Sequence, residues 1–171
     1  MKTKDLVKAS LIGVLTLVAG YIQIPLGPVP VTMQTLVVNV AAIILAPIPA
    51  LVSMVLHLVL KLLISGAQYV FMPSFGFVVG FAIAALIGSL VYKKIGPGKK
   101  AMVLSIVLTA LIPYIVGLPY MAYILNGVKG AGMSPMAIMK AGFFIFIPGD
   151  ILKIVLAYII SSRLVRAIGR S

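Results

Sequence analysis

The sequence predicts an all-α integral membrane protein with six transmembrane helices in one domain, residues 1–171. Hydrophobic residues make up 63% of the chain and charged residues only 9%, whereas a soluble domain carries about 25% charged residues. The mean hydropathy is +1.26. So few charges cannot cover a water-facing surface, and long apolar stretches alternate with turns rich in Gly and Pro.

The first two segments are expected at about 6–24 and 31–46. The first ends in "IQIPLGPVPVT", where three prolines and a glycine prevent a continuous helix. The second ends at "LAPIPA". The third, about 50–65, precedes the loop "SGAQYVFMPS", and the fourth, about 74–92, ends in "KKIGPGKK".

The last two segments are expected at about 101–124 and 136–165, a length that suits membrane crossing. Interruptions of the fifth segment are predicted at Pro113, Gly117 and Pro119. A break in the sixth is predicted at Pro148 and Gly149, so that a new helix begins just before Asp150.

Six segments place both termini on one side, and basic residues collect there. Ten of the fourteen basic residues belong to this side: Lys2, Lys4, Lys8, Lys93, Lys94, Lys99, Lys100, Arg163, Arg166 and Arg170. We therefore expect both termini to be cytoplasmic in a multi-pass protein of the cell membrane. The clusters lie where lipid headgroups would be and form no continuous basic face, which argues against nucleic-acid binding.

Asp150 and Lys153 are the strongest candidates for a functional site. The chain has only two acidic residues, and Asp150 alone lies within an apolar run. Positions i and i+3 share a helix face, so the two side chains can reach each other. They could form a pair that only neutralises itself, but apolar residues could replace a packing pair without loss. A carboxylate at a helix start beside an ammonium group favours a ligand site.

Weaker polar patterns occur elsewhere. Ser53, His57, Lys61 and Ser65 form a stripe at steps of four, and Thr32, Thr35 and Asn39 share a face if their segment is helical. Internal packing is the favoured interpretation of both patterns. Gln68, Tyr69 and Ser74 lie beside aromatic residues in "SGAQYVFMPSFG". This mixture suits either an amphipathic organic ligand or an interfacial belt.

Small residues mark helix contacts. Gly76, Gly80, Ala84 and Gly88 recur every four residues, a spacing that predicts close helix packing in lipid. Ala9 and Gly13 form a shorter pair that could pack internally or dock another membrane subunit.

Four motifs in order, "IPLGPVPVTMQTL", "PSFGFVVGF", "GLPYMAYILNG" and "IPGDILKIVLA", resemble the BioY family over nearly the whole chain. BioY proteins are biotin-binding S-components of prokaryotic energy-coupling-factor (ECF) vitamin importers. The resemblance implies the six-helix S-component fold, capture of biotin from outside, a separate transmembrane coupling protein and two cytosolic ATPases. It implies that residues 24–34, ending at Gln34, form a lid over the ligand. It also implies that Asp150 and Lys153 hold the ligand and that Ala9 and Gly13 contact the coupling protein.

One motif departs from the family pattern. Many members read "GPTGGY" where this chain reads "MPSFGF" at 72–77, which leaves a related acid such as lipoate as an alternative ligand. A stand-alone ion-coupled carrier with Asp150 as its proton site is a less favoured alternative.

The chain has no Cys, one His and two acids, which argues against a metal site, a cofactor and an enzyme. Because the sequence contains no P-loop motif, ATP would have to be bound by partner subunits.

Overall fold

The computed structural model describes residues 2–168, which form a bundle of helices with one small β-hairpin. The α-helices are α1 (Thr3–Ala19), α2 (Gln34–Ile44), α3 (Pro47–Ser65), α4 (Phe75–Ile95), α5 (Lys99–Ala122), α6 (Pro135–Gly142) and α7 (Ile147–Ile168). The shorter elements are β1 (Gln23–Ile24), β2 (Val31–Thr32), the 3₁₀ helices η1 (Ala67–Phe71) and η3 (Phe144–Phe146), and the π-helical turn η2 (Tyr123–Val128). β1 and β2 pair antiparallel.

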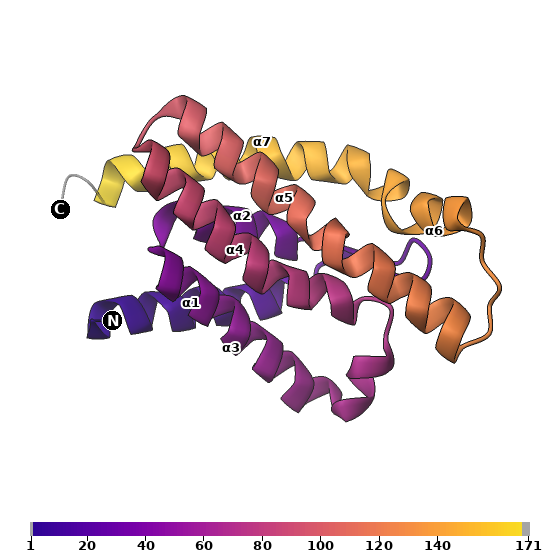
Figure 1. The fold of residues 1–171 in the computed structure, drawn as a ribbon. Helices are drawn as coiled ribbons and strands as arrows, with labels where there is room; N and C mark the ends of the chain where they lie inside the picture. The colour runs from indigo at the N-terminus through magenta and orange to yellow at the C-terminus, as the bar shows by residue number, and fades with distance from the viewer. Residues whose placement is uncertain (1, 169–171) are drawn as a thin grey trace.

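The helices pack around α4, which contacts α2, α3 and α5 (Figure 1). On the outside of this group, α1 packs against α3, and α7 packs against α2 and α5. Within the described residues four helical stretches are long and apolar enough to cross a membrane: Pro47–Ser65, Phe75–Ile95, Lys99–Val128 and Pro135–Ala167. The shorter α1 and α2 complete six segments. The predicted class, an all-α membrane protein with six segments, is confirmed.

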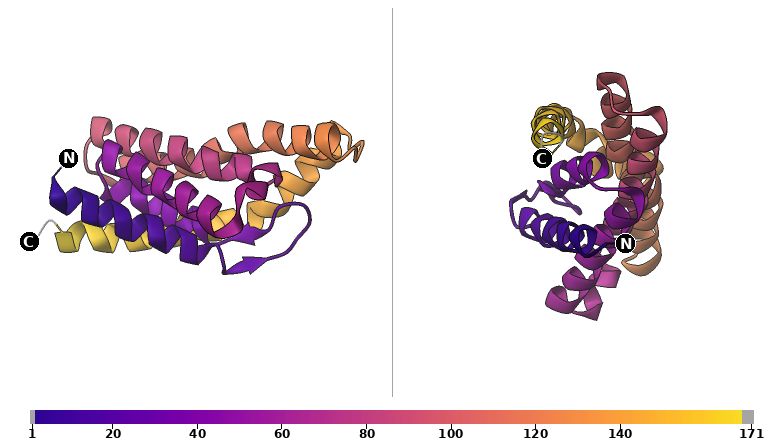
Figure 2. Two further views of the ribbon diagram at one scale, coloured as in Figure 1. Left: turned by 90° about the horizontal axis from the view of Figure 1, so that it is seen from below. Right: turned by 90° about the vertical axis from the view of Figure 1, so that its left-hand side faces the viewer.

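The two ends of the bundle differ in composition. The start of α1, the end of α7 and the turn between α4 and α5 lie at one end (Figures 1 and 2). The β-hairpin lies in the other half of the molecule, beyond the end of α1 (Figure 2). The basic clusters predicted to share one side therefore do share one end, except that Arg170 lies outside the described residues.

Close contact between α4 and α5 depends on the predicted ladder of small residues. A Cβ atom added at Gly80 would lie 2.8 Å from the Cα of Pro113. About two turns further along α4, Ser105 Oγ donates a 2.7 Å hydrogen bond to the carbonyl of Gly88. The internal packing predicted for this ladder is confirmed, because only small residues let two backbones approach so closely.

The predicted interruption of the fifth segment is wrong. α5 continues through Pro113 and Pro119 and through Gly117 between them. Proline removes one backbone hydrogen bond, but membrane helices tolerate it where neighbouring helices and local adjustments compensate. Here the backbone of Pro113 lies against Gly80, so the proline is part of the tight contact between α4 and α5.

Three predicted boundaries also need correction. α1 ends at Ala19, and residues 23–24 of the expected first segment form β1 instead. Residues 31–32 of the expected second segment form β2, so α2 begins only at Gln34. The sixth segment breaks at residues 143–146, and Pro148 lies inside the first turn of α7. Proline fits the first turn because its missing N–H would have had no helical partner there. The predicted helix start before Asp150 is therefore present, three residues upstream at Ile147.

A candidate ligand-binding cavity beneath the hairpin

A cavity of about 390 Å³ lies among the hairpin, the start of α2, the end of α3, the loop that contains η1, and helices α4, α5 and α7. Its polar lining comes from residues of several of these elements: Gln23, Thr32, Gln34, Thr35, Lys61, Ser65, Gln68, Tyr69, Ser74, Tyr114, Asp150 and Lys153. Ligand pockets in proteins are typically of this size.

The Asp150 and Lys153 side chains form the polar centre of one wall. Lys153 Nζ lies 2.9 Å from Asp150 Oδ1, and it also donates a 3.0 Å hydrogen bond to Thr35 Oγ1 on α2. The hydroxyl of Tyr114 on α5 donates a hydrogen bond to Asp150 Oδ2. Three helices therefore fix the orientation of one ion pair, whose side chains are only 15% and 6% exposed for Asp150 and Lys153.

The local fold explains why a carboxylate is stable here. Asp150 lies in the first turn of α7, where backbone N–H groups lack helical partners and the helix dipole favours negative charge. A carboxylate can accept about four hydrogen bonds and an ammonium group can donate three. Lys153 uses two donors on Asp150 and Thr35, so one remains for a molecule in the cavity.

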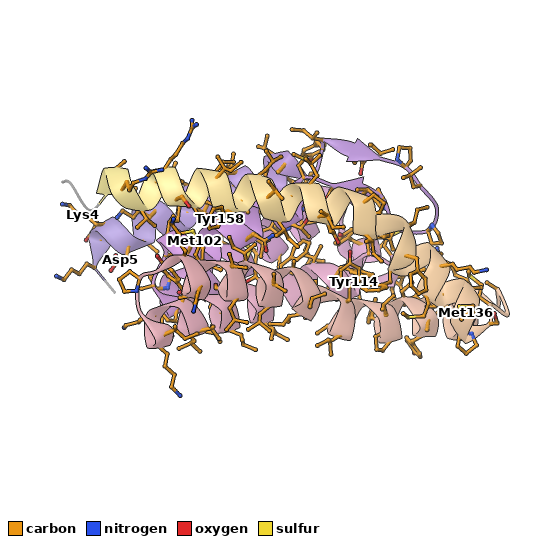
Figure 3. The ribbon with its side chains drawn as sticks, turned by 90° about the horizontal axis from the view of Figure 1, so that it is seen from above. Lys4, Asp5, Met102, Tyr114, Met136 and Tyr158 are labelled. Carbon is orange, nitrogen blue, oxygen red and sulfur yellow. The ribbon has the colours of Figure 1, made fainter. Side chains whose placement is uncertain are left out.

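Tyr114 is the functional candidate that the sequence patterns did not single out. It sits between α5 and α7, in the half of the bundle nearer Met136 than Lys4 (Figure 3). Tyr114 is 9% exposed, and its ring packs edge-on against Phe77 and Phe143. A tyrosine hydroxyl inside an apolar run needs a polar partner. This requirement is the feature of the sequence that could have identified Tyr114.

The Gln34 side chain lies at the root of the hairpin. Gln34 Nε2 lies 3.0 Å from His57 Nε2 on α3, and Thr32 Oγ1 donates a 3.2 Å hydrogen bond to Gln34 Oε1. Both Gln34 and His57 are buried. Within the predicted stripe on α3, Ser53 and His57 are therefore packed internally, whereas Lys61 and Ser65 line the cavity.

The loop after α3 supplies the remaining predicted residues. Ser74 Oγ donates a long, 3.5 Å hydrogen bond to the hydroxyl of Tyr69, whose ring packs edge-on against Phe75. Burial raises the pKa of Tyr69, with the Ser74 hydrogen bond opposing this shift, so the phenol stays neutral near pH 7. Gln68 Nε2 donates back to the carbonyl of Ser65 at the end of α3.

An apolar surface faces these polar groups. Val29 at the hairpin tip packs in one buried cluster with Phe77, Tyr114 and Phe146. All four residues line the cavity. The cavity therefore offers a few directed polar groups and an aromatic wall, the combination that suits an amphipathic small molecule.

All six residues predicted to bind substrate, Gln34, Gln68, Tyr69, Ser74, Asp150 and Lys153, line this one cavity. The motif "MPSFGF" at 72–77, which differs from the family pattern, also lines the cavity through Met72, Pro73, Ser74 and Phe77. No group of three or more His, Cys, Asp or Glu side chains that could hold a metal occurs within residues 2–168.

Ala9 and Gly13 lie away from the cavity, where α1 meets α3. Ala9 is fully buried, and a Cβ atom added at Gly13 would lie 2.7 Å from the carbonyl oxygen of Ser53. This pair therefore packs α1 against α3 within the chain. The partner-docking role suggested for it stays a prediction.

Comparison with known proteins identifies the family of this chain. The family model described as "BioY family" matches residues 1–170. The chain belongs to the BioY family. A curated BioY relative from Rhizobium etli, named "Biotin transporter BioY", is 31% identical over 176 residues, covering 92% of this chain and 90% of the relative. The BioY protein of Thermotoga maritima, with the same name, is 29% identical over 94% of this chain and 95% of its own.

The fold of this BioY family member is also found in a solved structure. It is the crystal structure of the S-component for biotin from an ECF-type ABC transporter, with a TM-score of 0.82 and 20% sequence identity. The match covers 97% of this chain and 95% of the solved one. The S-component fold predicted from the motifs is thereby confirmed.

Proposed function

We propose that this protein captures biotin from the extracytoplasmic side of a prokaryotic cell membrane as the S-component of an ECF-type importer. The observation that carries the proposal is the Asp150–Lys153 pair on the wall of a cavity beneath the hairpin. Family membership and the curated biotin transporters among its relatives support biotin as the ligand.

The chemistry of biotin matches the polar wall. Its ureido ring offers two N–H donors and one carbonyl acceptor. Asp150 retains lone pairs for those donors, and Lys153 retains one N–H for the carbonyl. The apolar thiophane ring and chain of biotin would pack on Val29, Phe77 and Phe146.

The orientation of the protein follows from its charges. The basic clusters at the end that holds the start of α1 and the end of α7 favour a cytoplasmic location for that end. The hairpin of residues 23–32 would then face the outside and cover the cavity. In this arrangement the hairpin acts as the lid that ligand must pass.

The energy for import would come from partners. The sequence contains no P-loop motif, and a coupling transmembrane protein with two cytosolic ATPases would supply ATP-driven transport.

In the membrane, α1 presents Leu11, Val14, Leu15 and Val18 as exposed apolar side chains. We propose that this exposed face of α1 meets the coupling protein, in place of the direct contact by Ala9 and Gly13 expected from the sequence, because those two residues hold α1 close to α3.

Reconstituted vesicles test this proposal. Vesicles that contain the chain, a coupling protein and two ATPases should accumulate labelled biotin when ATP is supplied. Vesicles that contain the chain alone should bind biotin without accumulating it, even under an imposed proton gradient. Accumulation driven by the gradient in the lone chain would favour the ion-coupled carrier instead.

A further inference from the structure

The charges around the cavity do not balance. Three charged side chains line it, Lys61, Asp150 and Lys153. Asp150 and Lys153 neutralise each other at 2.9 Å. Lys61, which extends from α3, leaves the cavity with one net positive charge.

The protein itself holds no side-chain carboxylate that could balance Lys61. The whole chain has two acidic residues. Asp150 is paired with Lys153, and Asp5 lies in the first turn of α1, where the backbone N–H of Lys2 donates to it. Figure 3 shows Asp5 at the end of the bundle opposite Tyr114. A negative charge beside Lys61 must therefore come from a bound molecule or from solvent.

The surroundings of Lys61 hold its ammonium group in place. Lys61 Nζ lies 5.2 Å from the ring centroid of Tyr69 and 5.6 Å from that of Tyr21. Aromatic faces within about 6 Å attract a cation, but they carry no negative charge that would balance it. Tyr21 precedes β1 and Tyr69 lies in η1, so the two rings fix the ammonium group between the hairpin root and the loop after α3.

Lys61 and the Asp150–Lys153 pair approach the cavity from different parts of the fold. α3 packs against α1 and α4, whereas α7 packs against α2 and α5. The cavity thus has a hydrogen-bonding pair on α7 and a lone cation on α3. This arrangement fits a ligand with a neutral polar head at one end and a carboxylate at the other.

We propose that Lys61 is the carboxylate-recognition residue of the cavity, which makes the protein selective for the free acid over neutral derivatives of its ligand. The inference rests on the proposed function, because it takes biotin as the acid. A charge-assisted hydrogen bond to a carboxylate is stronger than a neutral one. Replacing the carboxylate by an ester should therefore weaken binding through Lys61 alone.

The test compares biotin with biotin methyl ester on the purified protein. The wild type should bind biotin at least about tenfold more tightly than the ester. Lys61→Met should weaken the binding of biotin by about the same factor. It should leave the affinity for the ester unchanged, which also shows that the variant is folded. Lys61→Arg should keep the preference for the acid. Lys129→Met, an exposed lysine that does not line the cavity, is the matched control and should behave as wild type.

Two results overturn the proposal and they are distinguishable. If Lys61→Met keeps the wild-type preference for biotin over the ester, Lys61 does not meet the carboxylate, although biotin binding stands. If the wild type binds neither compound, the biotin assignment itself fails and the role of Lys61 fails with it.

Discussion

The hydroxyl of Tyr114 on α5 donates a hydrogen bond to Oδ2 of Asp150 on α7, 36 residues further along the chain. Oδ1 of the same carboxylate holds Lys153, which in turn reaches Thr35 on α2. One carboxylate therefore ties three helices together at the cavity wall. The cluster therefore has a structural role and a binding role, and substitutions can separate the two.

Asp150→Asn should weaken biotin binding by about 100-fold or more, because a neutral amide is a poorer acceptor for the ureido N–H groups. It also leaves Lys153 buried without its anion, which should lower the thermal stability. Isothermal titration and a melting curve in the same detergent measure the two effects.

The double variant Asp150→Asn with Lys153→Met is the control that tells these effects apart. Removing both charges should restore much of the stability, because no unpaired charge remains buried. It should not restore binding. Wild-type affinity in this double variant would mean that the pair serves packing only.

Tyr114→Phe should reduce biotin affinity by about fivefold to tenfold, the effect of losing one hydrogen bond to a charged group. The ring and its contacts with Phe77 and Phe143 stay in place, so the melting temperature should change little. Tyr123→Phe, at a tyrosine that is 65% exposed, should leave affinity unchanged. Equal affinities for wild type and Tyr114→Phe would show that the hydroxyl does not orient Asp150.

Val29→Ser should speed the release of biotin about tenfold, because it removes apolar contact between the hairpin tip and the cluster of Phe77 and Phe146. The association rate should change much less. Leu26→Ser, at an exposed hairpin residue outside the cavity lining, is the matched control. Stopped-flow mixing with labelled biotin gives the association rate, and displacement by unlabelled biotin gives the release rate. Identical release from the two variants would contradict a lid role for Val29.

Gly80→Leu should lower the melting temperature by about 5 °C or more, because a side chain there meets the backbone of Pro113. Gly98→Leu is the control, since nothing lies within 4 Å of a Cβ atom at that glycine and its backbone is extended. A thermal shift assay in detergent compares the two. Equal melting temperatures would show that α4 and α5 do not depend on close packing at Gly80.

Composition, charge and the small-residue ladder predicted the class of fold, because apolar length and Gly spacing are local properties of a chain. Helix boundaries near prolines were harder to predict. Pro113 and Pro119 lie within a continuous helix since tertiary packing compensates for a lost hydrogen bond, and sequence alone does not display that compensation.

The site shows the same division between local and long-range information. Asp150 and Lys153 were predictable because charge inside an apolar run is rare and an i, i+3 pair is local. Tyr114 and the contribution of Thr35 to the cluster depend on how α5 and α2 approach α7. In the sequence Lys61 is one member of a polar stripe, and its lack of a counter-charge matters because its side chain lines the cavity.

Direct titration of the purified protein with biotin and with lipoate tests the central claim. The ureido ring of biotin can satisfy both Asp150 and Lys153, whereas the dithiolane ring of lipoate has no N–H donor or carbonyl to offer them. The protein should therefore bind biotin tightly and lipoate at least about 100-fold more weakly. Lipoate binding as tight as that of biotin, or no binding of biotin, would contradict the account.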